Sequence, residues 1–159
     1  MKKEYKNNGF TLIELLVVIA VIGILAAVAV FSMQNSFQTA RDTQRKSDLK
    51  QYQAALEVYA NNNDGLYVRR TSGTTRADTT LCNDLGMSSC PSDPINSSPY
   101  FYYYTSDSAT CSTGGSPCAT EYILKVRLES KSSTDWMYCS NGKSGEIPSG
   151  VVSSELCPL

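Results

Sequence analysis

The sequence contains no histidine, and this absence removes the commonest acid–base residue and metal ligand of proteins. It also lacks a Gly-x-Ser-x-Gly nucleophile elbow, a phosphate-binding glycine loop and any Cys-x-x-Cys pair. We therefore expect that the protein is not an enzyme and that it holds neither a cofactor nor a metal ion.

An excess of charge of one sign is absent as well. The chain has 14 basic and 15 acidic residues and a net charge of −1. Nucleic-acid-binding domains carry a clear basic excess, so no specific nucleic acid is predicted as a partner.

One long apolar run, from Phe10 to Phe31, stands out against this background. At about 1.5 Å per residue, a helix of this length spans the roughly 30 Å hydrocarbon core of a bilayer. The only charged residue in the run is Glu14. A charge there costs about 2.5–3.5 kcal/mol on insertion scales, so Glu14 is a candidate functional residue that needs a partner.

The segment before the apolar run differs from an ordinary secretory signal peptide. Residues 1–9 are short and polar, and their lysines favour retention on the cytoplasmic side of a membrane. A secretory signal peptide is cleaved after its apolar stretch, whereas here the distinctive junction, Gly9-Phe10, lies before it. We predict cleavage after Gly9, which creates an α-amino group on Phe10 as the partner of Glu14.

These residues carry a resemblance to a known family. The segment Gly-Phe-Thr-Leu-Ile-Glu-Leu at residues 9–15, with the apolar residues that follow it, closely resembles the class III signal of type IV pilins and pseudopilins. The resemblance implies that a prepilin peptidase cuts after Gly9 and N-methylates Phe10. It also implies that Glu14 meets the Phe10 amine of a neighbouring copy, and that an inner-membrane assembly platform acts on the lipid-embedded subunit.

The pairing also has a physical basis apart from the family. Helices extracted from lipid must be buried again, and copies of themselves are the nearest apolar surface. A lone carboxylate inside such a bundle is unfavourable, whereas one paired with an ammonium is tolerated and sets the axial register. The alternative is a plain signal anchor, in which Glu14 reaches toward the membrane interface.

The helix is predicted to continue beyond the membrane. Residues 34–63 contain no glycine or proline, and the apolar side chains recur at helical spacing at Leu49, Tyr52, Leu56 and Tyr59. We expect a helix of about 50 residues that stops at the Asn-Asn-Asn-Asp-Gly stretch, residues 61–65. The positions opposite this stripe carry Arg41, Asp42, Arg45, Lys46, Asp48 and Lys50. The cluster Arg41, Arg45 and Lys46 is expected to be a solvated face or a charge set between subunits, with a phospholipid or DNA patch as the alternative.

A small β domain is predicted after the helix. Residues 66–98 resemble a long connecting loop, and strands are expected at residues 100–104, 121–129, 135–139 and 146–147. The fold class is therefore α+β, with three or four antiparallel strands on the amphipathic half of the helix. The resemblance implies the same pilin-like fold. Asp93, in a Pro-Ser-Asp-Pro stretch similar to an element of major pseudopilins, is expected to be a turn residue.

All six cysteines lie in the β domain, and their even number in an exported segment argues for disulfides. Sequential pairing is favoured because each bond then closes a short loop: Cys82–Cys90, Cys111–Cys118 and Cys139–Cys157. The last pair resembles the disulfide-bounded C-terminal region of many type IV pilins. Free buried thiols or a metal site remain the alternatives.

These patterns together predict how the chain is divided into segments. Residues 1–9 form a cleaved leader, 10–33 the membrane and assembly half of the helix, 34–64 its amphipathic half and 65–159 the disulfide-stapled head. By resemblance, the protein is a pilus subunit that moves from the cytoplasmic membrane to an extracellular filament. The alternatives are a pseudopilin of a type II secretion system and, in another class, a membrane-anchored extracellular binding module.

Overall fold

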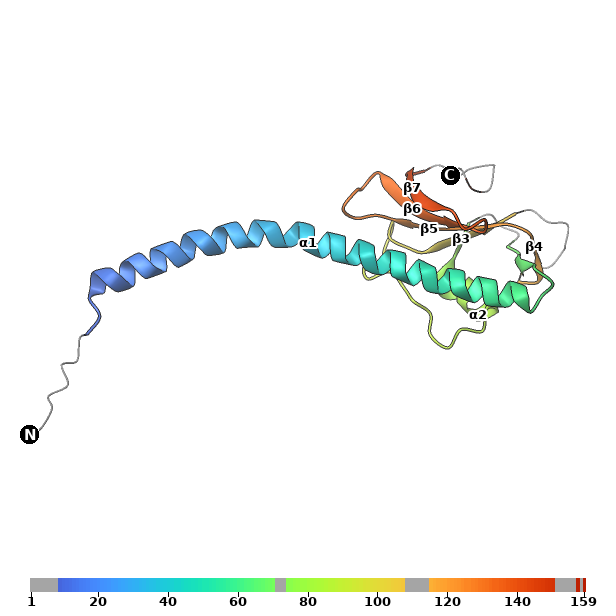
Figure 1. Ribbon diagram of the computed structural model, residues 1–159, viewed down its shortest axis with the longest axis horizontal. Helices are drawn as coiled ribbons and strands as arrows, with labels where there is room; N and C mark the ends of the chain where they lie inside the picture. Colours follow the sequence, from blue (N-terminus) through green and yellow to red (C-terminus); the bar gives the residue numbers. More distant parts are fainter. Residues whose placement is uncertain (1–8, 71–73, 108–114, 151–156, 158) are drawn as a thin grey trace, which may run out of the picture. The chain divides into compact units, whose positions relative to one another are not determined.

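A computed structural model of the chain describes residues 9–70, 74–107, 115–150, 157 and 159, without the side chains of residues 29–32. The chain divides into two compact units, the first ending at Phe37 and the second beginning at Gln38. Figure 1 shows the elements of each unit. The leader, residues 1–8, lies outside the described residues.

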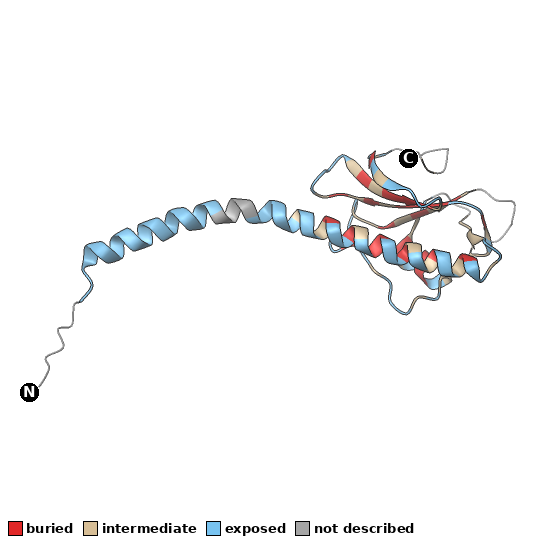
Figure 2. Cartoon of the chain, in the orientation of Figure 1, coloured by how far each residue is buried: buried red, intermediate tan, exposed pale blue. Residues whose placement is uncertain are grey.

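The first unit is the N-terminal part of helix α1, which runs from Leu12 to Asn61 over 50 residues, the length predicted. The described side chains of this unit from Phe10 to Phe37 are exposed (Figure 2). Within the part of the chain that the structure describes, α1 is the one helix long and apolar enough to cross a membrane, with a mean hydropathy of 3.0 in its most apolar window.

In the second unit α1 is amphipathic. Leu49, Tyr52 and Leu56 are fully buried, and Tyr59 is half-buried, so the predicted apolar stripe is confirmed. The helix also ends where predicted. Gly65, with a φ of +81°, donates its N–H to the carbonyl of Ala60, a left-handed closure that suits a residue without a Cβ.

An antiparallel five-stranded sheet, in the order β2-β3-β5-β6-β7, packs on this stripe. Its strands are β2 (Thr75–Arg76), β3 (Tyr103–Ser106), β5 (Tyr122–Arg127), β6 (Thr134–Cys139) and β7 (Ser144–Pro148). The α+β class is therefore confirmed, and the sheet has one strand more than the upper number of four that was expected. The additional strand is β2, a two-residue edge strand whose existence depends on its pairing with β3.

The prediction of one long loop at residues 66–98 was wrong. That segment contains β1 (Tyr67–Val68), β2, the π-helical turn η1 (Ala77–Leu81) and the short helix α2 (Cys82–Asp84). Strand β1 pairs with β4 (Pro117–Ala119) in a separate two-stranded sheet. Such short elements have no periodic pattern of their own, and their pairing partners lie far away in the chain.

The strand expected at residues 100–104 begins later, at Tyr103. The N–H of Tyr100 bonds to the carbonyl of Ser97, and that of Phe101 bonds to Pro99, so this part of the chain turns. Proline has no N–H to donate to a sheet and favours turns. Tyr102 and Tyr104 are nevertheless fully buried while Phe101 and Tyr103 are half-buried, as the predicted alternation requires.

The sheet has apolar residues on both faces. The face toward α1 contributes Tyr104, Leu124 and Val126 to the main core. The opposite face has a smaller cluster of Ile123, Met137, Cys139 and Ile147, against which Cys157 and Leu159 pack. The C-terminal residues therefore cover part of the face that α1 leaves open.

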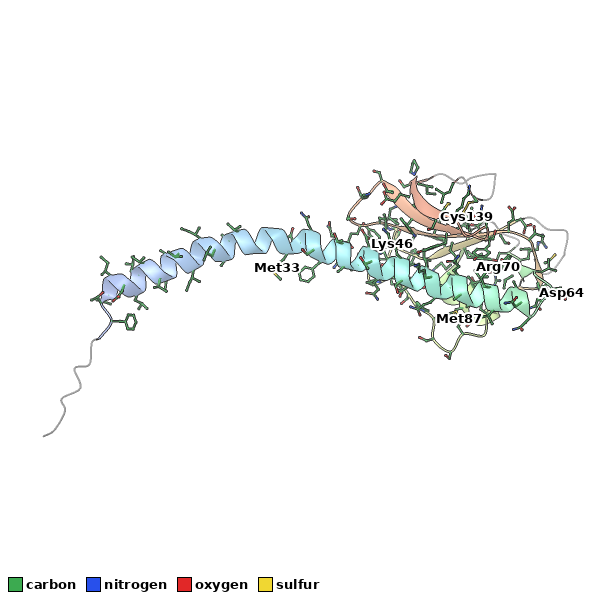
Figure 3. The ribbon with its side chains drawn as sticks, viewed as in Figure 1. Met33, Lys46, Asp64, Arg70, Met87 and Cys139 are labelled. Atoms are coloured by element: carbon green, nitrogen blue, oxygen red, sulfur yellow. A yellow bond between two sulfur atoms is a disulfide. The ribbon has the colours of Figure 1, made fainter. Side chains whose placement is uncertain are left out.

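Two of the favoured disulfides are present. Cys82 of α2 bonds to Cys90, and Cys139 of β6, labelled in Figure 3, bonds to Cys157. Cys118 of β4 is also disulfide-bonded. Its predicted partner, Cys111, lies outside the described residues. The free-thiol alternative is therefore wrong for the five cysteines that the structure describes.

We predict that Leu56→Ala lowers the free energy of unfolding by about 2–5 kcal/mol, because it opens a cavity under the sheet. Val58→Ala, on the exposed side of the same helix, should change it by about 0.5 kcal/mol or less. Denaturant unfolding of the full chain in detergent micelles, followed by the fluorescence of Trp136, measures both. Equal losses in the two variants would contradict this account of the core.

Candidate functional site

The predicted cleavage junction lies in an accessible position. Gly9 and Phe10 precede the first turn of α1 in non-helical conformation, and Phe10 is 87% exposed. A Cβ built on Gly9 meets no atom within 4 Å. Nothing in the described chain itself therefore demands glycine here, and any such requirement comes from a molecule that approaches this peptide bond.

Glu14 lies in the first turn of α1 and takes part in its N-terminal cap. Thr11 donates its backbone N–H and its hydroxyl to Glu14 Oε2 at 3.4 and 3.3 Å, and Glu14 donates its N–H to Thr11 Oγ1 at 3.3 Å. This is the reciprocal arrangement of a capping box. This cap was not predicted, although Thr-x-x-Glu before an apolar run is its signature.

The cap leaves the Glu14 carboxylate available to a stronger donor. Its two bonds are long, they are exposed, and they come from neutral groups. Hydrogen bonds from an ammonium to a carboxylate are shorter and roughly twice as strong. An α-amino group brought to this end of the helix can therefore take over the carboxylate. The Phe10–Glu14 pair joins two copies of the chain and stays a prediction.

The apolar surface behind Glu14 has no partner among the described residues. Leu12, Ile13, Leu16 and Ile24 each keep more than 60% of their surface exposed. Soluble monomers rarely expose continuous apolar patches beyond a few hundred Å². This part of α1 therefore requires lipid or other protein around it.

A second cluster, of buried charges, lies where α1 meets the head. Arg45 is fully buried and binds Asp93 through two bonds, Nε to Oδ2 at 2.6 Å and Nη2 to Oδ1 at 3.0 Å. Its Nη1 also contacts Asp42 at 2.8 Å and Glu129 at 3.3 Å. The expectation of a solvated or inter-subunit face was wrong for Arg45, which is buried together with Asp42 and Asp48 because the loops before β3 and after β5 cover them.

The cluster stabilises two of its carboxylates, those of Asp42 and Glu129, in their charged form. Burial raises the pKa of Asp42, but bonds from the N–H of Glu129 and from Ser130 outweigh burial, so the pKa falls below its ordinary value. A hydrogen bond from Arg41 lowers the pKa of Glu129. Asp93 is the predicted turn residue, since it accepts the N–H of Ile95, but its ion pair with Arg45 was not predicted.

Neighbouring groups complete the junction. Tyr102 donates its hydroxyl to Asp48 at 2.7 Å, and burial raises the pKa values of both side chains. Lys46, labelled in Figure 3, places its ammonium 4.0 Å from the centre of the Trp136 ring in β6. The charged groups of the helix thus hold the head by hydrogen bonds and ion pairs. They form a structural joint between the helix and the head.

We predict that Arg45→Ala lowers the free energy of unfolding by about 3–5 kcal/mol, because it leaves buried carboxylates without a counter-ion. The exposed Lys50 on the same helix provides the control, and Lys50→Ala should cost about 0.5 kcal/mol or less. Denaturant titration of the full chain in micelles measures both. A similar, small loss for the two variants would show that the cluster is not a structural joint.

The same cluster predicts loss of stability in acid. The folded state lowers the pKa values of Asp42 and Glu129 below 3.8 and 4.5, so the unfolded chain binds more protons as the pH falls through this range. The contribution of Asp42 and Glu129 to the free energy of unfolding is complete above about pH 4.5. It is lost as the pH falls through the lowered values. Asp48, whose pKa is raised, acts in the opposite direction.

Thermal melts between pH 3 and 7 test this. The melting temperature should fall less steeply with decreasing pH in Glu129→Gln and more steeply in Asp48→Asn. If the pH dependence of the melting temperature is unchanged in Glu129→Gln, Glu129 does not contribute to the loss of stability in acid.

Comparison with known proteins identifies the N-terminal segment. The model of the prokaryotic N-terminal methylation motif matches residues 5–30. Type II secretion system core protein G of Pseudomonas aeruginosa is 41% identical over 58 residues, 36% of this chain and 41% of that protein. Type IV major pilin protein PilA of Myxococcus xanthus is 37% identical over 59 residues, 37% of this chain and 27% of that protein.

A third relative, prepilin peptidase-dependent protein D of Escherichia coli, is 41% identical over 61 residues, 38% of this chain and 42% of that protein. The similarity thus covers well under half of each of these relatives. No solved structure matches the chain. The chain carries the class III methylation signal and is distantly homologous to type IV pilins and type II pseudopilins, which are structural proteins.

Proposed function

We propose that this protein is the structural subunit of a type IV pilus. In this proposal a prepilin peptidase removes residues 1–9 and methylates Phe10, and the subunit waits in the cytoplasmic membrane on its apolar helix. An inner-membrane assembly platform then adds it to a surface filament that serves adhesion, motility or DNA uptake.

The observation that carries the proposal is the first unit of α1. It combines an accessible Gly9-Phe10 junction, a carboxylate in the first helical turn and an apolar surface exposed on all sides. A signal anchor needs only the last of these features. The methylation-motif match over residues 5–30 covers all three.

Assembly follows from the need to bury this surface again when the subunit leaves the bilayer. Copies packed side by side cover the apolar residues, and each Glu14 exchanges its weak cap bonds for the Phe10 ammonium of a neighbour. A head-to-tail contact of this kind does not close on itself, and its repetition gives a helical filament. The disulfide-stapled head remains outside the helical bundle.

A pseudopilin of a type II secretion system is the second candidate, and the similarity to core protein G favours it. Such a subunit shares the processing and the Glu14 pairing but would not accumulate in long surface fibres. A membrane-anchored binding module is the candidate from another class. It would keep its leader and would not depend on Glu14.

We expect the N-terminal peptide of this protein in sheared surface material to begin at N-methylated Phe10, as shown by mass spectrometry of the sheared and membrane fractions. The processed peptide confined to the membrane fraction would favour the pseudopilin. An intact leader peptide in both fractions would refute both filament functions.

We also expect Glu14→Ala to reduce the subunit in sheared fibres at least about tenfold while leaving the amount in the membrane unchanged, because an unpaired ammonium would be buried in the bundle. Glu121→Gln is the matched control, since it removes an exposed carboxylate from the head. Immunoblots of both fractions measure the outcome. Normal assembly of Glu14→Ala would contradict the pairing.

A further inference from the structure

The face of the sheet that points away from α1 has a small cavity of about 150 Å³. Tyr103 of β3 and Lys125 of β5 are direct cross-strand neighbours on this face, and Arg127 and Asp135 form the next pair along it. All four side chains line the cavity, together with Pro99 from the turn before β3. None of them belongs to the core or to the joint around Arg45.

The cavity combines a neutral ion pair with one extra cation. Arg127 donates Nε to Asp135 Oδ1, and its Nη1 bonds to the carbonyl of Ser132 at 3.2 Å. The structure records no hydrogen bond or ion pair for the half-buried Lys125 among the residues it describes. The cavity therefore carries a net positive charge of one, although the whole chain is slightly acidic.

Tyr103 is the one aromatic residue among those that line the cavity, and its ring packs against a neighbouring side chain. The Tyr103 ring meets the Phe101 ring edge to face, with centroids 6.2 Å apart. The Arg76 guanidinium lies 4.0 Å from the centre of the Phe101 ring and is itself paired with Asp78. Ring and cation contacts of this kind are favourable and directional. They keep Tyr103 beside Lys125 before any ligand arrives.

These groups restrict the chemistry of a ligand. Lys125 selects an anion, but the Asp135 carboxylate nearby disfavours a compact anion such as phosphate. The Arg127–Asp135 pair offers both donors and an acceptor, which suits hydroxyl groups beside the anionic group. Tyr103 and Pro99 offer apolar surface to the C–H face of a ring. Ligand sites usually have volumes of about 300–1,000 Å³, so this cavity admits only one small ring.

We propose that this cavity binds a single sugar-acid unit. The carboxylate of the sugar pairs with Lys125, its hydroxyls bond to Arg127 and Asp135, and its ring lies against Tyr103. A cavity of this size takes a terminal or branching uronic acid rather than several residues of a chain. The site goes beyond the proposed filament function, because binding needs only the head and not assembly.

The test is a calorimetric titration of the full chain in detergent micelles with methyl β-D-glucuronide. We expect saturable binding with a Kd on the order of 1 mM, typical of a small polar ligand with a few contacts. Lys125→Gln should weaken binding about tenfold or more, since it removes a charge-assisted bond. Lys50→Gln, which removes an exposed lysine from α1, should leave the Kd unchanged.

Two further ligands distinguish the parts of the proposal. Methyl β-D-glucoside, which has the same ring without the carboxylate, should bind about tenfold more weakly or worse. Sodium acetate should also bind more weakly than the glucuronide, because it lacks the ring and the hydroxyls. Near-UV circular dichroism checks that Lys125→Gln is folded.

The proposal is overturned if the unsubstituted protein shows no saturable binding of the glucuronide. It is also overturned if acetate binds as tightly, or if Lys50→Gln weakens binding as much as Lys125→Gln. None of these results bears on the processing of Phe10 or the fibre level of Glu14 variants, so the two proposals fail separately.

Discussion

The central constraint on this protein is that one continuous helix must be buried in two different ways. The second half of α1 buries Leu49, Tyr52 and Leu56 under the sheet of its own chain. The first half has an equally apolar surface but no partner among the described residues. Because exposed apolar surface of this extent is unfavourable in water, the first half must be covered by lipid or by other protein.

The two halves of α1 also differ in how their polar side chains are bonded. At the start of α1, Thr11 and Glu14 cap the helix with weak, exposed bonds that a neighbouring ammonium can replace. In the second unit, Arg45 binds three carboxylates in a cluster whose centre is buried. Exchangeable bonds suit a surface that meets different partners, and buried ion pairs suit a joint that stays closed. The contrast follows from burial, since the cap bonds of Glu14 are exposed whereas Arg45, Asp42 and Asp93 are buried.

The head combines local and long-range cross-links. Cys82–Cys90 closes a short loop beside the core, whereas Cys139–Cys157 draws the C-terminal residues over the outward face of the sheet. Disulfides of this kind stabilise mainly by restricting the unfolded chain. The cavity at Lys125 lies on the same outward face. A head that is locked by covalent bonds can expose polar surface for recognition without loss of its fold.

The sequence by itself determined the features that depend on neighbours in the chain: the length and the end of α1, its apolar stripe, the main strands β5 and β6, and the Gly9-Phe10-Glu14 signal. Such features repeat with a helix or strand period or stand at fixed spacing. Only the tertiary structure decided that Arg45 is buried, that β2 joins the sheet and that Lys125 lines a cavity. Each of these depends on contacts between residues distant in sequence, such as Arg45 with Asp93 and Glu129. A charged residue on a helix looks the same in the sequence whether water or a folded loop covers it.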